Sequence, residues 1–165
     1  MKSKMLILAL LCIVGLAACN RGEVTDVQRD PSGGLDITAQ LTETDISAAI
    51  ADALAIQNPL LRDPKVDLQP GQIVITGTHD KRDGTGTVSG TMTVTLSVDN
   101  GAILPQVTQI DIEGIKPSDE QVTNMNQRIA ERVTQRADKQ GRQITVKSVD
   151  VTDTAVVVIF NLKKA

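Results

Sequence analysis

The chain has 165 residues, a net charge of −3 and an aromatic content of 1%, with one Phe and no Trp or Tyr. This is the length of one ordinary domain and is enough to bury an apolar core. Nucleic acid requires clustered Lys and Arg and often stacking aromatics, so a mildly acidic chain with a single aromatic residue is a poor candidate for binding it. The core must be aliphatic.

The N-terminus has the order of an export signal. Lys2 and Lys4 precede an apolar run over residues 5–14, and small side chains follow up to Ala18. The run is about half of the roughly 20 residues that a membrane-spanning helix needs, which disfavours a permanent transmembrane anchor. We therefore predict a signal peptide over residues 1–18.

The residues Leu16-Ala17-Ala18-Cys19 resemble the lipobox of bacterial lipoproteins, in which the thiol carries acyl chains such as palmitate. Two or more chains, at ~0.8 kcal/mol per buried methylene, hold a protein stably on a bilayer. We expect lipid attachment at Cys19 and a location in the bacterial cell envelope, anchored on the extracytoplasmic side of a membrane. Either the inner or the outer membrane is compatible with the sequence.

Residues 19–34 are polar, contain Pro31, Gly33 and Gly34, and show no periodicity. They predict a flexible lipidated tether. The rest of the chain, residues 35–165, is expected to form a single domain.

The domain begins with a short predicted strand over residues 35–41, where apolar and polar residues alternate. Thr42 or Thr44 then caps a predicted helix whose apolar residues recur at intervals of three and four. The helix should end near Asn58, which precedes a proline.

Hairpins follow. Pro70-Gly71 suits a type II turn, and Asn100-Gly101 is a strong signal for a two-residue hairpin. Residues 87–98 alternate without error and predict one long strand. The strand that pairs back changes parity between Val107 and Ile110, which predicts a β-bulge.

The pattern of residues 118–139 predicts a long helix with a capping Ser and an apolar stripe, ending before Gly141. Two strands over residues 143–151 and 155–162 close the chain, the first with a second change of parity and a second expected bulge. The last strand is apolar on both sides, so it is either buried between layers or an exposed, adhesive edge.

The long strand spans ~40 Å at 3.3 Å per residue, and the predicted helix 118–139 is comparably long. We therefore expect an α+β fold, a curved antiparallel sheet wrapped around a long amphipathic helix, with a second, shorter helix. An open aliphatic seam between helix and sheet would accept an acyl chain, and a closed seam would be only a core. The predicted lining is Ile50, Leu54, Met92, Val94, Leu96, Ile110, Ile112, Met125, Ile129 and Val133.

Catalysis and metal binding have little support in the sequence. His79 is the one histidine and lies beside Asp80, with Asp83 nearby, but no free thiol or glycine-flanked serine accompanies them. The spacing fits neither a nucleophile motif nor a calcium loop. We expect a non-catalytic protein with no cofactor and no metal.

Four segments together resemble a known family. They are Thr-Glu-Thr-Asp-Ile-Ser-Ala-Ala-Ile at the first helix, Val-Asp-Leu-Gln-Pro-Gly-Gln-Ile-Val-Ile-Thr-Gly, the Thr-rich strand ending at Asp99-Asn100-Gly101, and Ile-Glu-Gly-Ile before a capped helix. The pattern is similar to the phospholipid-binding family typified by mycobacterial lipomannan elongation factor A and covers residues 35–162. The resemblance implies a fold like that of tubular lipid-binding domains and a phospholipid ligand. The chain lacks the Gly-x-Pro-Phe-type segment of actinobacterial members, which puts their glycolipid-pathway role in doubt.

Two functional hypotheses follow. The first is a membrane-anchored lipoprotein that binds a phospholipid or similar acyl ligand in an aliphatic groove. The alternative is a lipid-tethered structural or protein-interaction module of the cell envelope, which docks a protein partner through a sheet edge or helix and has a closed core. A sealed core would favour the alternative, and a continuous apolar groove open at one end would favour lipid binding.

Overall fold

The computed structural model describes residues 22–54, 61–81, 84–115 and 143–163, with Pro117, Ser118, Glu120, 122–124, Asn126 and Gln127. The described residues contain eight named strands and one named helix. In chain order these are β1 (Glu23–Arg29), β2 (Leu35–Thr42), α2 (Glu43–Leu54), β3 (Arg62–Gln69), β4 (Gln72–Asp80), β5 (Thr87–Asp99), β6 (Ala102–Ile112), β7 (Gln143–Val151) and β8 (Ala155–Lys163).

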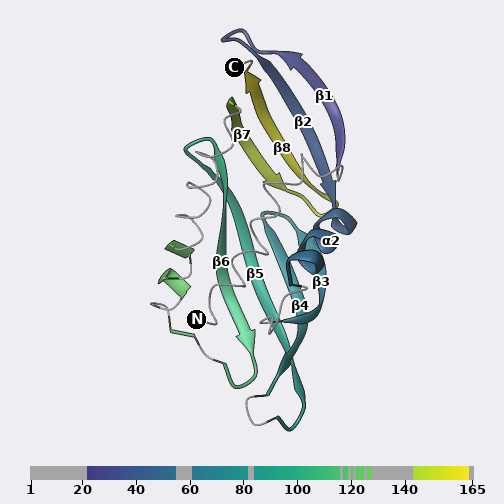
Figure 1. Ribbon diagram of the computed structural model, residues 1–165, viewed down its shortest axis with the longest axis vertical. Coiled ribbons are helices and arrows are strands. Elements are labelled where there is room, and N and C mark those ends of the chain that lie inside the picture. Colours follow the sequence, from purple (N-terminus) through teal and green to yellow (C-terminus); the bar gives the residue numbers. More distant parts are fainter. Residues whose placement is uncertain are drawn as a thin grey trace.

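The strands form two antiparallel four-stranded sheets. The first two and last two strands make the terminal sheet, in the order β1-β2-β8-β7, and the four strands between them make the central sheet, in the order β3-β4-β5-β6. The molecule is elongated, with the terminal sheet at one end and α2 beside the region where the sheets meet (Figure 1).

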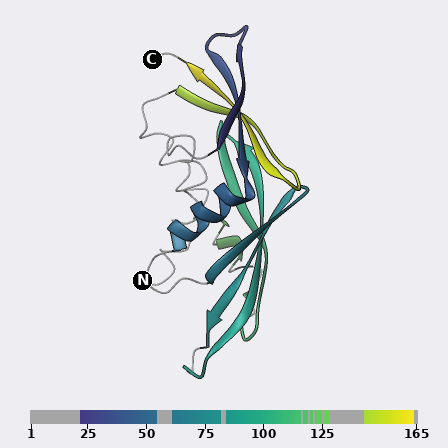
Figure 2. The same cartoon turned by 90° about the vertical axis from the view of Figure 1, so that its right-hand side faces the viewer.

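Two backbone hydrogen bonds join the sheets through β7. The N–H of Val146 donates to the carbonyl of Gly101 in the β5–β6 turn at 2.7 Å, and the N–H of Gly71 in the β3–β4 turn donates to the carbonyl of Val151 at 2.7 Å. Buried side chains of both sheets consequently belong to one core cluster. Figure 2 shows α2 on one side of the curved double sheet.

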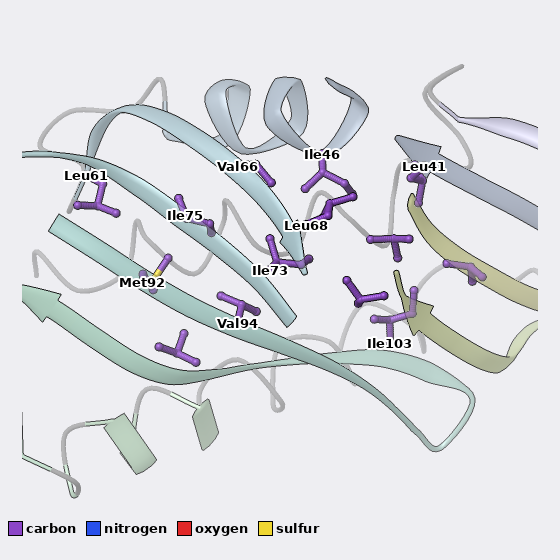
Figure 3. Close-up of a cluster of buried hydrophobic side chains, with 14 of the residues drawn as sticks. Leu41, Ile46, Leu61, Val66, Leu68, Ile73, Ile75, Met92, Val94 and Ile103 are labelled. Carbon is purple, nitrogen blue, oxygen red and sulfur yellow. The ribbon is translucent and has the colours of Figure 1, made fainter. Parts of the chain in front are cut away.

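The core lies between α2 and one face of the central sheet. Alternate residues of β5 are buried, as period-two strands with one covered face require. Ile46 is fully buried and points from α2 toward Leu68 and Ile73 (Figure 3), which stabilises the fold by ~1.5–3 kcal/mol. We call the face of both sheets that carries these buried side chains the inner face.

The start of α2 follows the predicted capping chemistry. The backbone N–H of Asp45 donates to the hydroxyl of Thr42 at 3.3 Å, and the N–H of Thr42 donates to the carboxylate of Asp45 at 2.9 Å. This reciprocal pair satisfies two amides at the helix start. Of the two proposed caps, Thr42 is the one used.

The two predicted hairpin turns are confirmed. Asn100 and Gly101 have φ angles of 49° and 75°, and two successive positive values are what a type I′ turn requires. Gly71 has a φ of 80°, as expected for the third position of a type II turn.

Both predicted bulges are also confirmed. The pairing of β5 with β6 shifts between Thr93 and Val94, which leaves Thr108 as the extra residue of β6. The pairing of β7 with β8 shifts between Val146 and Ser148, which leaves Lys147 as the extra residue of β7. Each bulge restores apolar residues to the inner face after the change of parity.

The expected fold class was wrong. We expected an α+β fold with a curved antiparallel sheet wrapped around a long amphipathic helix, whereas the structure is mostly β, with two sheets and a 12-residue α2. The described residues hold no long amphipathic helix, and most of the predicted helix 118–139 lies outside them. The alternation within a single strand does not show with which other strands it pairs, so the pattern did not reveal the division into two sheets.

The first strand was also missed. Residues 23–29, assigned to the flexible tether over residues 19–34, form β1 and pair with β2. Their apolar residues do not alternate, because the register of β1 shifts between Val24 and Asp26. A strand with such a bulge carries no period-two signal.

The last strand, β8, lies between β2 and β7, so it is not an edge. Val156 and Val158 on its inner face are buried, and Ala155 on the opposite face is buried as well. The structure excludes the exposed edge, and Val157 and Ile159 on the opposite face are partly buried.

Gly90 provides a test of the packing. A Cβ at this position would lie 2.7 Å from Ile112 Cγ1 and 2.7 Å from Leu61 Cδ2. Gly90→Ala should therefore lower the free energy of unfolding by about 1–3 kcal/mol through overpacking. Urea unfolding measures the loss, with Ser89→Ala on the exposed face as the control. Equal stability of the two variants would contradict this packing.

Candidate functional site

The inner face is sealed over the central sheet. Ile73 and Ile75 of β4 and Val107 of β6 are each buried. Among the described residues, these side chains belong to one buried aliphatic core.

The inner face continues, buried, onto the terminal sheet. Leu41 of β2 pairs with Val156 of β8, which pairs with Val151 of β7, and all three are buried. Residues paired directly across strands point to the same side of a sheet. Along each of these strands, alternate residues therefore stay on the inner face, from this buried row to the far end of the terminal sheet.

The face becomes open in that direction. Leu35 and Ile144 both pair with Leu162, so they share the inner face, and they are 39% and 41% exposed. Val27 and Val24 on β1 pair with inner-face residues of β2 and are 53% and 59% exposed. We call Val24, Val27, Leu35 and Ile144 the open apolar face.

Charge divides the two faces of the terminal sheet. The pairing register places Arg29 opposite Leu35 on the inner face, and no Asp or Glu of the four strands shares that face within the described residues. The opposite face carries the acids Glu23, Asp26, Asp36 and Asp150. One side of the sheet is thus aliphatic with one cation, and the other is acidic on balance, because its four acids outnumber Lys147 and Lys163.

A polar cluster lies on the acidic side. The ammonium of Lys147 donates to the carboxylates of Asp30 and Asp36, at 2.6 Å each. The side-chain amide of Asn161, which is 3% exposed, donates to the same two carboxylates at 3.0 and 2.8 Å. The cluster ties the β1–β2 turn to β7 and β8.

The charges of the cluster perturb each other. Hydrogen bonds from Lys147 and then from Ser32 hold the pKa of Asp30 well below its usual range. Hydrogen bonds to Asp30 and then to Asp36 raise the pKa of Lys147. The cluster contains no nucleophile or imidazole, and its ionic groups are paired with each other, so its chemistry is that of a structural clamp.

The residues considered for catalysis do not assemble into a site. His79 lies in β4 opposite Val88, and Asp80 forms an ion pair with Arg62 at 2.5 Å. Asp83 lies outside the described residues. Over the part of the chain that the structure describes, no three His, Cys, Asp or Glu side chains are grouped in a way that would hold a metal ion.

Comparison with protein-family models matches residues 17–161 to the family described as LmeA-like phospholipid-binding. The chain belongs to this family. Neither the curated proteins nor the solved structures contained a match. For this LmeA-like chain, the aliphatic inner face is therefore the surface of interest. In the described residues, no helix is both long enough and apolar enough to cross a bilayer.

The structure gathers five of the predicted lining residues on the inner face. Met92, Val94 and Ile112 are 4%, 1% and 2% exposed, whereas Leu96 and Ile110 are partly buried at the margin of the core. The side chains of Ile50 and Leu54 lie outside the described part of the chain, as do Met125, Ile129 and Val133.

Sequence reasoning missed Val24 and Val27. They are three residues apart, and the bulge at Thr25 between them is what places both on one face. Sequence reasoning also missed Asn126, whose side-chain amide accepts from the N–H of Val107 at 2.9 Å and donates to its carbonyl at 2.8 Å. This asparagine satisfies the backbone groups of an edge strand beside a bulge, and a pattern of hydrophobic residues cannot reveal such a role.

The polar cluster generates a prediction about stability and pH. Lys147→Met should lower the free energy of unfolding at neutral pH, because Asp30 and Asp36 would lose the cation between them. The contribution of Asp30, whose folded pKa is lowered, is complete above its unfolded pKa of about 3.9 and is lost as the pH falls below it. The contribution of Lys147, whose folded pKa is raised, is complete below about 10.4 and is lost as the pH rises beyond it.

Urea unfolding across this range measures the difference between the wild type and Lys147→Met. The difference should be largest between about pH 4 and 10 and should shrink toward acid. Lys65→Met, at an exposed lysine of β3, is the matched control. A difference that stays constant into acid would show that the ion pairs do not stabilise the fold.

Proposed function

We propose that this chain is a membrane-anchored bacterial lipoprotein that binds a phospholipid or a similar acyl ligand without catalysis. The observation that carries the proposal is the inner face, which is sealed under α2 and open at the end of the terminal sheet. Membership of the phospholipid-binding family supports the same ligand class.

The terminal sheet, on which the inner face opens, is long enough for an acyl chain. The eight residues of β2 span about 27 Å at 3.4 Å per residue. The acyl chains of one leaflet extend about 15 Å, half of a hydrocarbon core of about 30 Å. An acyl chain can therefore lie along the terminal sheet, beginning at Leu35 and Ile144, while Arg29 supplies a cation for a phosphate.

The anchor is the second part of the proposal. The order of charged, apolar and small residues before Cys19 supports export and lipid attachment. A protein held by acyl chains on Cys19 lies on a membrane without crossing it. We place it on the extracytoplasmic side of a bacterial membrane.

A protein-interaction module is the alternative function. Strand β1 is exposed at all seven residues and forms an edge of the terminal sheet, so it can accept another strand. The sealed core under α2 is compatible with this use as well.

Native mass spectrometry of the mature protein, released from membranes in mild detergent and followed by lipid extraction, tests ligand binding. We expect a co-purifying phospholipid near one per chain. Ile144→Asp should lower its occupancy by at least about tenfold, because a carboxylate would be buried against the acyl chain at a cost above 1.4 kcal/mol. Ser148→Asp, at an exposed position on the opposite face of β7, is the control. A protein that carries no phospholipid and takes up no phospholipid from vesicles would refute the lipid hypothesis and favour the interaction module.

Substitution of Cys19 tests the anchor. Cys19→Ser removes the thiol that acyl chains require, so the protein should move from the membrane fraction to the soluble or unprocessed fraction. The intact mass of the wild type should show cleavage before residue 19 and the added acyl groups. An unmodified Cys19 in the membrane-bound wild type would refute this mode of attachment.

A further inference from the structure

The predicted lipid attachment site lies very close to the folded domain. Gly22 already packs against β2, where a Cβ would lie 2.9 Å from the carbonyl of Gln40 and 3.0 Å from Leu41 Cδ2. Cys19 is three residues earlier, so the connecting chain reaches at most about 11 Å when fully extended. The acyl chains on Cys19 therefore hold the start of β1 at the membrane surface.

Along β1, the open apolar face begins at Val24, two residues after Gly22, and continues toward Leu35 and Ile144 at the other end of the strand. Val24 and Val27 are the first inner-face residues after Gly22, and both are more than half exposed. Contiguous exposed aliphatic residues on a soluble surface mark a contact with protein or membrane. A bilayer that holds the acyl chains of Cys19 would be close enough to contact these exposed valines, so no other partner is needed to cover them.

The charges favour the same orientation. The acids of the terminal sheet lie on its opposite face, and Arg29 lies on the inner face near Leu35. Anionic lipid head groups repel the acidic face and attract a cation near the surface. Of the two faces of the sheet, the inner face is the one that a phospholipid bilayer accepts.

We propose that the open apolar face lies against the phospholipid bilayer that carries the Cys19 anchor, with Val24 and Val27 in contact with the acyl region. This orientation rests on the proposed lipid attachment at Cys19. The inner face then opens onto the membrane, and a phospholipid passes between bilayer and protein along one apolar surface without crossing water.

Site-specific spin labels test the orientation in the full-length lipidated protein, reconstituted in vesicles of phosphatidylcholine and phosphatidylglycerol. Cys19 carries the lipid and Cys12 is removed with the signal, so an introduced cysteine is the one free thiol of the mature chain. Val27→Cys reports on the inner face, and Gln28→Cys on the opposite face is its matched control. Collisions of each label with oxygen, which concentrates in the bilayer, and with a water-soluble nickel complex give its depth.

We expect the ratio of oxygen to nickel collisions to be several-fold higher at position 27 than at position 28. Equal, water-like ratios with an acylated Cys19 confirmed by mass would overturn the orientation and leave the anchor intact. Spin–spin broadening between labels at position 27 would assign the face to a second copy of the chain and also overturn it. An unacylated Cys19 would remove the anchor itself, and with it the basis of the orientation.

Discussion

The joining of the two sheets through β7 is the constraint on which the rest of the structure depends. The hydrogen bonds from Val146 to Gly101 and from Gly71 to Val151 hold β7 against two turns of the central sheet. Without them the terminal sheet would have a separate inner face with too few strands to bury it. With them, the core under α2 extends into the terminal sheet, and the exposed residues beyond it become the margin of one continuous apolar surface.

The bulge at Lys147 affects both faces of the strand that joins the two sheets. An extra residue in β7 restores the apolar residues on both sides of it to the inner face, and it directs the lysine to Asp30 and Asp36 on the opposite face. The same backbone irregularity therefore supports the aliphatic surface and clamps the β1–β2 turn. Since β1 otherwise pairs only with β2, this clamp gives the β1–β2 turn a second connection to the rest of the sheet.

Sequence reasoning succeeded where one residue type controls local geometry and failed where several segments decide together. The turns at Pro70-Gly71 and Asn100-Gly101 and both bulges were predictable, because positive φ and parity are local properties. The fold class was not, because a strand pattern does not say with which sheet it pairs. The site was predicted only in part. Alternation placed Met92 and Leu96 on the inner face, but only tertiary packing sealed the first and left the second at the margin.

An exposed aliphatic surface next to an unpaired edge strand would ordinarily be a hazard. Soluble proteins protect such edges with charge or cover them, since they aggregate otherwise. In this chain Arg29 is the one charged residue of β1 on the inner face, and the acids of the same strand point away from its valines. If Cys19 is acylated as proposed, the domain would lie within about 11 Å of a bilayer, and the membrane would cover this surface. The absence of acidic side chains from the inner face of the terminal sheet, as far as the described residues show it, is the pattern that selection for contact with lipid would leave.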